Sequence, residues 1–370
     1  MKVSIITLHR ITNFGSLLQT YATQTYIRKL GYETEVVDFV PNGITFRRGV
    51  WPKGASLVSK MIKVLPLTFV NLIQYNMVNS FMKKYITVSP KRYGSFAELA
   101  ANVPEADIYL SGSDQVWNTQ NNNPLNDLKA YYLCYAPKGK RKIAYAGSFG
   151  KEDFSDAEKA EIGKWLKDYD VISVREDTAL KTLETLGVSG EWVTDPTLLL
   201  TQEEWRELCK KEKPKPGYVF VYNLNRNKLL EEAAVKIAEK KGLRVVNFAD
   251  TFEFIKGAEN LFNNDALDFL NYISNADFVV TDSFHGTAFS LNFNRQLICV
   301  SAPKYNCRLE SILRLTGLKD ERLVFDIETA LKVSEKEINY DEVNSKLDSA
   351  RDFSRTFLKN ALEGKQNEQY

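Results

Sequence analysis

The feature that most constrains the fold of this chain is the alternation of short apolar runs with helical patterns. An apolar run at residues 3–8 is followed by a polar turn, a helical pattern at about 17–30, and a second β-like run at 35–40. Gly31 directly after the helical pattern suits a C-terminal cap. Strands separated by helices of this length favour a parallel sheet with helices on both faces.

The same alternation continues along the chain and divides it in two. Prolines and lysines interrupt it between residues 195–197 and 213–217, just before a new series begins. We therefore predict an α/β protein with two Rossmann-like domains, residues 1–200 and 217–335. For residues 336–370 we predict a charged, helical C-terminal tail, which could return to pack on the first domain. The further strand-like runs are residues 107–110, 142–146, 171–174, 218–222, 244–248, 277–281 and 296–300.

Charge and residue usage exclude several classes of function. The 49 basic and 47 acidic residues nearly cancel, so no overall field attracts nucleic acid. Four cysteines lie scattered without a CxxC pair, and the chain has only two histidines, so we expect no zinc site built on thiolates and imidazoles. We also expect no other metal and no cofactor. The apolar start is too short for a signal peptide, which predicts a cytoplasmic protein.

One segment breaks the even distribution of charge. Between Phe39 and Ala97 there is no acidic residue, yet there are nine basic ones among many large apolar residues. We predict a basic, apolar helical insert at about residues 44–92. It is either a surface for peripheral contact with the inner face of the membrane and a lipid-linked partner, or a pair of core-packed helices with solvated lysines.

The turn after the first apolar run is the first candidate site. Asn13, Gly15 and Ser16 lie at the carboxyl end of a predicted strand, where open α/β sheets place ligands and helix N-termini favour anions. No GxGxxG fingerprint is present. In the alternative reading, Ser16 is only a helix N-cap and Gly15 completes a turn.

A second polar segment, SGSDQVWN, follows the run at residues 107–110. Its hydroxyls, amides and carboxylate suit a saccharide, and the indole of Trp117 could cover one face of a sugar ring. Asp114 could act as a base toward an acceptor hydroxyl. The alternative is a serine-rich turn with Trp117 buried.

Charged residues follow three later strands of the prediction. Arg175 and Glu176 open a helix and could hold an anion, or could form an ion pair that only starts the helix. His285 lies between a predicted strand and a predicted helix, a position that favours catalysis. His9 could face the same site, although a structural role suits it better. Lys304, Asn306 and Arg308 cluster after a further predicted strand, where the two basic groups could supply charge to an anionic substrate or the cluster could form a solvated loop.

The order and spacing of these motifs resemble the polysaccharide pyruvyl transferase family. The resemblance extends from residue 3 to about residue 325, and no single motif decides it. It rests on NFGSLLQTYA, SGSDQVWN, ISVREDTALKTLETLG, DPTLLL, TDSFHGTAFSLNF and NCRLESILRLTGL.

The resemblance implies a two-domain GT-B-type enzyme that moves the pyruvyl group of phosphoenolpyruvate onto a sugar diol as a ketal and releases phosphate. It places Arg175 and His285 at the phosphoenolpyruvate site. We assign the first domain to the acceptor and the second to the donor. The expected catalytic residues are His285 and Asp114; the expected donor residues are Arg175, Glu176, Ser283, Gly286, Lys304 and Arg308; the expected acceptor residues are Asn13, Gly15, Ser16, Gln19, Ser113, Gln115, Trp117 and Asn118.

One position departs from the family. Many members carry an arginine two residues before the histidine, where this chain has Ser283. Either Arg308 or Lys304 replaces that anion clamp, or the donor has changed or the activity is lost. The alternatives are a GT-B glycosyltransferase using a nucleotide sugar, and a non-catalytic saccharide-binding protein of a capsule or exopolysaccharide pathway.

Overall fold

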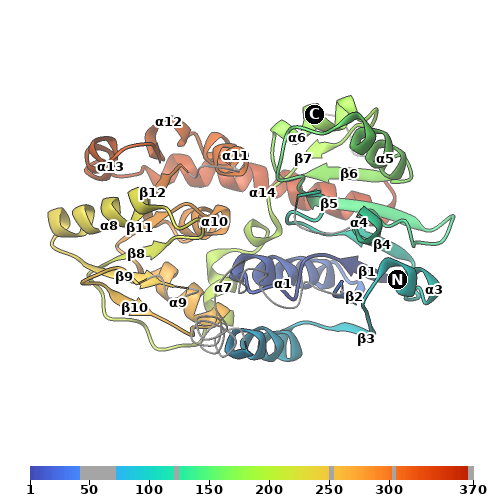
Figure 1. The fold of residues 1–370 in the computed structure, drawn as a ribbon, viewed down its shortest axis with the longest axis horizontal. Coiled ribbons are helices and arrows are strands. Elements are labelled where there is room, and N and C mark those ends of the chain that lie inside the picture. The colour runs from blue at the N-terminus through green and yellow to red at the C-terminus, as the bar shows by residue number, and fades with distance from the viewer. Residues whose placement is uncertain (42–71, 121–124, 250–253, 302–305, 366–370) are drawn as a thin grey trace, which may run out of the picture.

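The computed structural model describes residues 1–41, 72–120, 125–249, 254–301 and 306–365. Its strands form two separate parallel sheets, one in each half of the chain, with helices packed around them (Figure 1). The predicted pair of α/β domains is therefore confirmed.

The first sheet has seven strands in the order β3-β2-β1-β4-β5-β6-β7. Val3 pairs with Thr34 on one side and with Ile108 on the other, which makes β1 a central strand. The strands are β1 Lys2–Ile6, β2 Glu33–Phe39, β3 Val88–Tyr93, β4 Ile108–Ser111, β5 Arg141–Gly147, β6 Val171–Val174 and β7 Glu191–Trp192; the helices are α1 Phe14–Lys29, α3 Phe96–Ala101, α4 Leu125–Tyr131, α5 Asp156–Leu166 and α6 Thr178–Thr185, with a further helix at residues 72–85.

The second sheet has six strands in the order β10-β9-β8-β11-β12-β13. Its strands are β8 Tyr218–Tyr222, β9 Arg244–Phe248, β10 Glu259–Leu261, β11 Phe278–Thr281, β12 Gln296–Val300 and β13 Leu323–Val324. The remaining helices are η1 Pro196–Leu198, α7 Gln202–Leu208, α8 Lys228–Lys241, α9 Ala266–Asn275, α10 Phe284–Asn292, α11 Asn306–Thr316, α12 Lys319–Arg322, α13 Ile327–Ser334 and α14 Tyr340–Glu363.

Both sheets reverse their strand order at one point, between β1 and β4 in the first and between β8 and β11 in the second. In open parallel sheets, ligands bind outside the carboxyl ends of the strands at such a reversal. Ser16 lies in the first turn of the helix after β1, Asp114 in the turn after β4, and His285 in the first turn of the helix after β11. The topology therefore directs these predicted site residues to ligand-binding edges.

Aromatic packing joins the two domains beside these edges. Phe14, at the start of α1, stacks on Phe269 of α9 with ring centres 5.9 Å apart, and meets Phe248 of β9 edge-on at 5.4 Å. These contacts belong to a core cluster that contains residues of both sheets. The start of α1 is thereby fixed relative to the second domain.

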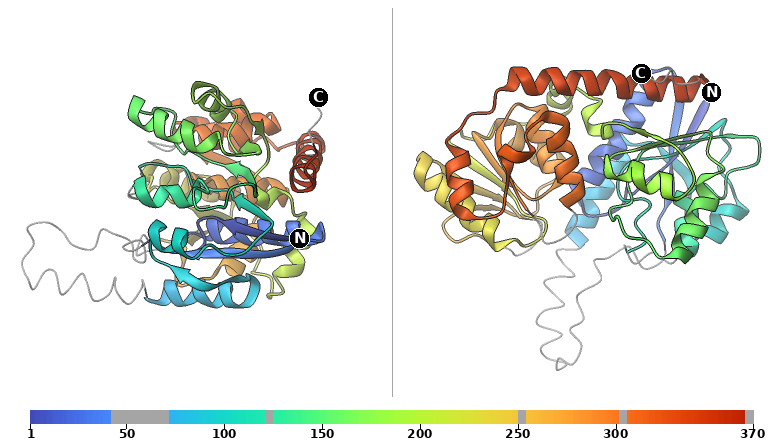
Figure 2. Two further views of the ribbon diagram at one scale, coloured as in Figure 1. Left: turned by 90° about the vertical axis from the view of Figure 1, so that its right-hand side faces the viewer. Right: turned by 90° about the horizontal axis from the view of Figure 1, so that it is seen from above.

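The C-terminal helix α14 crosses from the second domain back to the first (Figure 2). The Arg141 guanidinium of β5 donates a 3.0 Å hydrogen bond to the Ala361 carbonyl, and the Thr194 amide donates to the Ser354 hydroxyl at 2.9 Å. The predicted return of this helix to the first domain is confirmed.

The basic insert differs from its prediction where it can be followed. Residues 42–71 lie outside the described residues. The helix at 72–85 buries Phe81 and Met82 and exposes Lys83 and Lys84. The expected helical character up to residue 92 is wrong, because Val88–Tyr93 pairs with β2 as β3. Its proline is tolerated since β3 is an edge strand. None of the described helices has the length and apolar run that a membrane crossing requires.

Candidate functional site

The N-terminus of α1 brings the first polar group to the site. Asn13 caps this helix, because its side-chain oxygen accepts a 3.3 Å hydrogen bond from the Ser16 amide. The reading in which Ser16 is the cap is therefore wrong. The Ser16 hydroxyl instead donates to the carboxylate of Asp114.

Asp114 reaches the site from the turn after β4. Its backbone has the left-handed φ of 77°, which aspartate tolerates better than most residues, and its carbonyl accepts from the amides of Val116 and Ser148 at 2.7 and 3.1 Å. Burial acts to raise the pKa of the carboxyl, but the charges of Arg175 and His285 outweigh it, so the pKa is lowered. Asp114 is therefore an ionised carboxylate held by backbone geometry.

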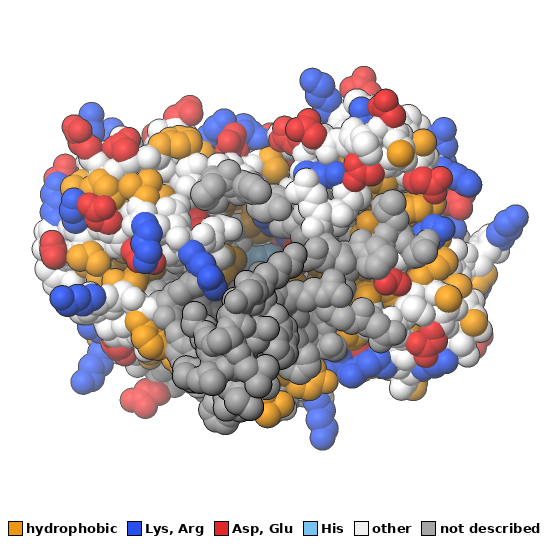
Figure 3. Space-filling model, viewed as in Figure 1, with side chains coloured by type: hydrophobic (Ala, Val, Ile, Leu, Met, Phe, Trp, Pro, Cys, Tyr) orange, Lys and Arg blue, Asp and Glu red, His pale blue; other side chains and the backbone are white. Residues whose placement is uncertain are grey.

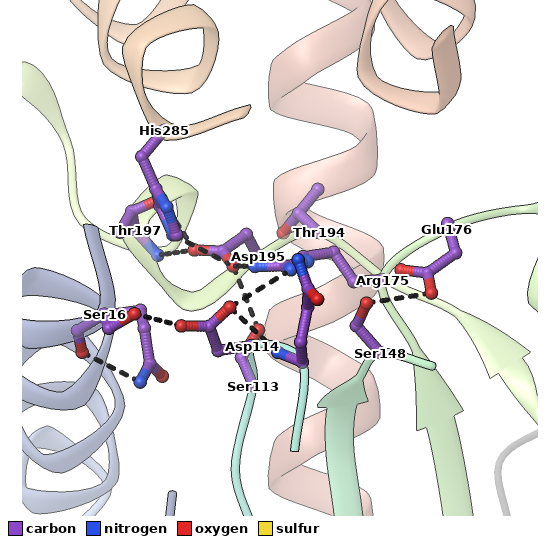
Figure 4. A network of polar contacts seen from close by, with 12 residues as sticks. Ser16, Ser113, Asp114, Ser148, Arg175, Glu176, Thr194, Asp195, Thr197 and His285 are labelled. Atoms are coloured by element: carbon purple, nitrogen blue, oxygen red, sulfur yellow. Dashed lines mark hydrogen bonds and ion pairs between the residues drawn. The ribbon is translucent and has the colours of Figure 1, made fainter. Parts of the chain in front are cut away.

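Arg175, directly after β6, lies at the centre of the site (Figure 4). It donates to Asp195 at 2.9 Å and lies 3.5 Å from Asp114, while Phe284 of the second domain covers its guanidinium with the ring centre 4.4 Å away. Only 1% of its side chain is exposed. The charge of Arg175 is thus already balanced by two carboxylates, and its first effect is to position them.

Asp195 is the residue that sequence reasoning missed. Its Oδ2 accepts from the Ser113 hydroxyl and from Arg175, both at 2.9 Å, while its Oδ1 accepts from the amide and hydroxyl of Thr197 at 2.9 and 2.7 Å. Burial acts to raise the pKa of this carboxyl, but His285 and Arg175 outweigh burial, so the pKa lies well below its usual value. The available signal was the DPT sequence, a carboxylate just beyond β7 at the ligand-binding edge.

His285 enters from the second domain on the first turn of α10. Ser283 caps that helix by accepting a 3.2 Å hydrogen bond from the Gly286 amide. His285 Nε2 lies 3.8 Å from Asp195 Oδ2, and a Cβ atom on Gly15 would overlap the imidazole at Nδ1. The imidazole is therefore enclosed between two elements of the first domain.

Gly286 allows the close packing that this arrangement needs. A Cβ atom at this position would lie 2.5 Å from the Thr281 hydroxyl at the end of β11. Gly286 therefore allows α10 to pack closely against the end of β11 beside His285.

Glu176 and Arg308 form the other side of the site. Glu176 Oε1 accepts from the Ser148 hydroxyl at 2.9 Å and the Phe149 amide at 3.1 Å, whereas its buried Oε2 has no hydrogen-bond partner. Burial raises the pKa of Glu176 despite the opposing charge of Arg175. Arg308, on the first turn of α11, has its pKa lowered by burial and then by the charge of Arg175.

Arg308 also spans the two domains. The Gln115 amide, with its oxygen turned toward Arg308, accepts from both terminal guanidinium nitrogens at 2.7 Å. A guanidinium whose own charge is disfavoured by burial and by a second cation favours the approach of an anion. Lys304, the other expected anchor, lies outside the described residues.

Several expected acceptor residues turn out to support the fold. Trp117 is fully buried, stacked on Tyr132 with ring centres 5.5 Å apart, so the expected open face for a sugar ring does not exist. Gln19 is buried and donates to Thr7 Oγ1 and the Ser16 carbonyl, each at 2.9 Å. Asn118 is buried and contacts Gln115.

The second histidine belongs to a separate cluster. His9 Nε2 lies 3.2 Å from Asp38 Oδ1, and Arg10 and Arg92 also donate to this carboxylate. His9 is therefore a satisfied structural residue. Among the residues that the structure describes, no group of three or more histidine, cysteine or acidic side chains could hold a metal ion.

On the molecular surface the two domains meet at a hollow, in which a histidine side chain is visible (Figure 3). Side chains of both domains form a network of polar contacts (Figure 4), to which the first domain contributes Asp114 and Arg175 and the second contributes His285. The site is thus built between domains.

Solved structures with the same arrangement include the UDP-GlcNAc 2-epimerase of Methanocaldococcus jannaschii in complex with UDP-GlcNAc and UDP. It is 14% identical with a TM-score of 0.53, over 92% of this chain and 93% of that one. The S. aureus MnaA–UDP co-structure is 10% identical with a TM-score of 0.55, over 100% and 99%. The UDP-N-acetylglucosamine 2-epimerase of Rickettsia bellii is 10% identical with a TM-score of 0.53, over 98% and 96%. These likenesses confirm the expected GT-B fold.

A comparison with curated proteins gave no match. A sequence model of the family described as polysaccharide pyruvyl transferase matches residues 13–302, which include the start of α1, Asp114, Arg175, Asp195 and His285. The chain therefore belongs to the polysaccharide pyruvyl transferase family and is a transferase with two parallel-sheet domains.

Proposed function

We propose that this protein transfers the pyruvyl group of phosphoenolpyruvate to two hydroxyls of a saccharide, forming a ketal and releasing phosphate. The observation that carries the proposal is the meeting of His285 with Asp195, whose carboxylate also binds Arg175, across the domain boundary. An acid, a base and cationic groups are what this reaction requires, and family membership supports the substrate class.

The proposed chemistry balances without a cofactor. His285 gives a proton to the methylene carbon of phosphoenolpyruvate, whose double-bond electrons form the new C–H bond and leave C2 electron-poor. One acceptor hydroxyl bonds to C2 and passes its proton to Asp114. The second hydroxyl then displaces phosphate, which leaves with the C2–O electrons and the proton from Asp114, while His285 regains a proton from that hydroxyl.

Asp114 suits the role of base because its carboxylate is ionised and held by the Ser16 hydroxyl. In this account Ser16 and Ser113 position the two carboxylates, and Asn13 and Gly15 form the helix start beside which the acceptor binds. The first domain thus serves the acceptor and the second the donor.

Arg308 suits the role of donor anchor that the family assigns to an arginine at position 283. Ser283 is occupied as the cap of α10, and Arg175 is held in two ion pairs. Arg308 lies close enough to Arg175 and Glu176 to interact electrostatically with both. We assign the donor phosphate or carboxylate to Arg308, with Arg175 and Glu176 orienting the surrounding groups.

The acceptor in our proposal is a capsule or exopolysaccharide precursor in the cytoplasm. A lipid-linked precursor would suit the basic insert, because basic residues attract anionic membrane surfaces. Lys83 and Lys84 are exposed on the described part of this insert. Sedimentation with anionic liposomes at low salt tests the membrane contact, and an absence of co-sedimentation would remove it from the proposal.

The function itself is tested by NMR of phosphoenolpyruvate mixed with the protein and a panel of diol-bearing glycosides. The expected result is inorganic phosphate in the ³¹P spectrum together with a new methyl singlet from the ketal. Release of a nucleoside diphosphate from nucleotide sugars, with phosphoenolpyruvate inert, would instead identify a glycosyltransferase. Glycan binding with no turnover of any donor would identify a saccharide-binding protein.

A further inference from the structure

The two nitrogens of His285 have different surroundings. Nε2 is fully buried and makes no hydrogen bond, although Asp195 Oδ2 lies 3.8 Å away. Nδ1 packs so closely against Gly15 that a Cβ atom there would overlap it. Of these two nitrogens, Nε2 is therefore the one that lies beside a charged group without a hydrogen bond.

The carboxylate of Asp195 is well placed to accept a hydrogen bond from the buried Nε2 of His285. Donors from the first domain already fix its carboxylate: Ser113 and Arg175 at Oδ2, and the amide and hydroxyl of Thr197 at Oδ1. Such a carboxylate cannot turn away, so the imidazole must adapt to it. A movement of about 1 Å would shorten the 3.8 Å separation to a charge-assisted hydrogen bond.

We propose that Asp195 is a positioning residue that binds His285 through Nε2–H and thereby fixes the orientation and the tautomer of the imidazole that acts on the donor substrate. This inference rests on the proposed function for the identity of the substrate. The pairing itself is a property of the protein alone and can be measured without any turnover.

Other charged groups also surround His285. Asp114 and Arg175 face it from the first domain, and Arg308 and Glu176 lie beyond them. The cations among these groups oppose an imidazolium, and the carboxylates favour it. Among the described residues, Asp195 is the carboxylate within ion-pair distance of His285, so its removal has the largest expected effect on the protonated ring.

The experiment uses ¹⁵N-histidine labelling of the full chain, which gives only two ring systems because the chain has two histidines. A His285→Gln variant assigns the signals. We expect the neutral ring of His285 in the wild type to carry its proton on Nε2. In Asp195→Asn, the pH midpoint of the His285 titration should fall by about one unit or more, since an opposite charge has been removed.

Two internal controls accompany this measurement. His9, which is 3.2 Å from Asp38, should titrate identically in the wild type and in Asp195→Asn. Asp177→Asn removes another carboxylate that bridges the domains, through Arg314 at 2.7 Å, and should leave the His285 titration unchanged. The Asp195→Glu variant, which retains the charge, should recover part of the wild-type midpoint.

A neutral wild-type ring protonated on Nδ1 would overturn the proposal, and this result needs no variant to fold. An unchanged His285 titration in a folded Asp195→Asn protein would also overturn it, leaving Asp195 as a structural partner of Arg175 only. With an active preparation, Asp195→Asn should lower kcat more than it changes KM and move the alkaline limb of the pH profile to lower pH. Failure of phosphate release in the wild type would count against the proposed function but not against the pairing.

Discussion

Gly15 of α1 and His285 of α10 approach so closely that any side chain at position 15 would overlap the imidazole. The two residues belong to different domains and are 270 positions apart by their numbering. The carboxyl end of the second sheet thus packs against the helix that follows the first strand. This contact explains why the candidate site exists only where the domains meet.

A Gly15→Ala substitution should therefore displace the imidazole while leaving the helix intact. We expect kcat to fall by about 100-fold, because a misplacement of about 1 Å has this effect on an oriented reaction. The midpoint of thermal unfolding should fall as well, since the added Cβ atom would lie 2.7 Å from the Cβ of His285 and such overpacking costs about 1–3 kcal/mol. Lys29→Ala on the same helix serves as the control in the phosphate-release assay. Wild-type turnover in Gly15→Ala would mean that His285 does not work from this position.

Trp117 should matter for stability and not for recognition of a sugar face. Its indole is fully buried against Tyr132 and Phe149. Trp117→Ala should lower the free energy of unfolding by about 3–5 kcal/mol, measured by urea denaturation, because a large core side chain is lost. Trp117→Phe should fold and keep much of the activity. A stable Trp117→Ala protein that had lost only acceptor affinity would argue for a binding role instead.

Glu158 should make stability depend on pH under acidic conditions. Burial acts to raise its pKa, but hydrogen bonds from Lys151, Thr119 and Ser155 lower it to about 2. The folded pKa lies below the unfolded value of about 4.3, so the stabilisation is present above that pH and is lost as the pH falls toward 2.

Between pH 5 and about 2, the free energy of unfolding should fall less in a Glu158→Gln variant than in the wild type. The expected difference is about 1 kcal/mol, because solvent screens this partly exposed group. Urea titrations at each pH provide the measurement. Glu161→Gln, on an exposed position of the same helix, should behave as the wild type does. Parallel pH profiles for all three proteins would exclude the predicted contribution of Glu158.

Much of the fold follows from local patterns in the sequence. Strands β6, β8, β9 and β12 lie at the residues predicted for them, because buried central strands give continuous apolar runs. Strands β7, β10 and β13 were missed, since each has only two or three residues and is formed by pairing with its neighbour. Strand β3 was hidden inside a segment with helical periodicity.

The candidate site was only partly predictable for a related reason. A polar residue at the end of an apolar run marks a ligand-binding edge, and this signal found Asp114, Arg175 and His285. It does not report which side chain will be buried, so Trp117 was given an exposed role. Asp195 was missed because its importance arises from groups that converge on it from three other segments, through Ser113, Arg175 and His285.

The most direct test of the central claim is calorimetric titration of phosphoenolpyruvate into the wild type, Arg308→Ala and Arg314→Ala. Both arginines lie on α11, but Arg314 pairs with Asp177 and Glu310 outside the site. We expect saturable binding to the wild type and to Arg314→Ala, with affinity at least about tenfold weaker in Arg308→Ala because a charge-assisted contact is lost. Absence of binding to the wild type, or equal affinity in all three proteins, would contradict the central claim.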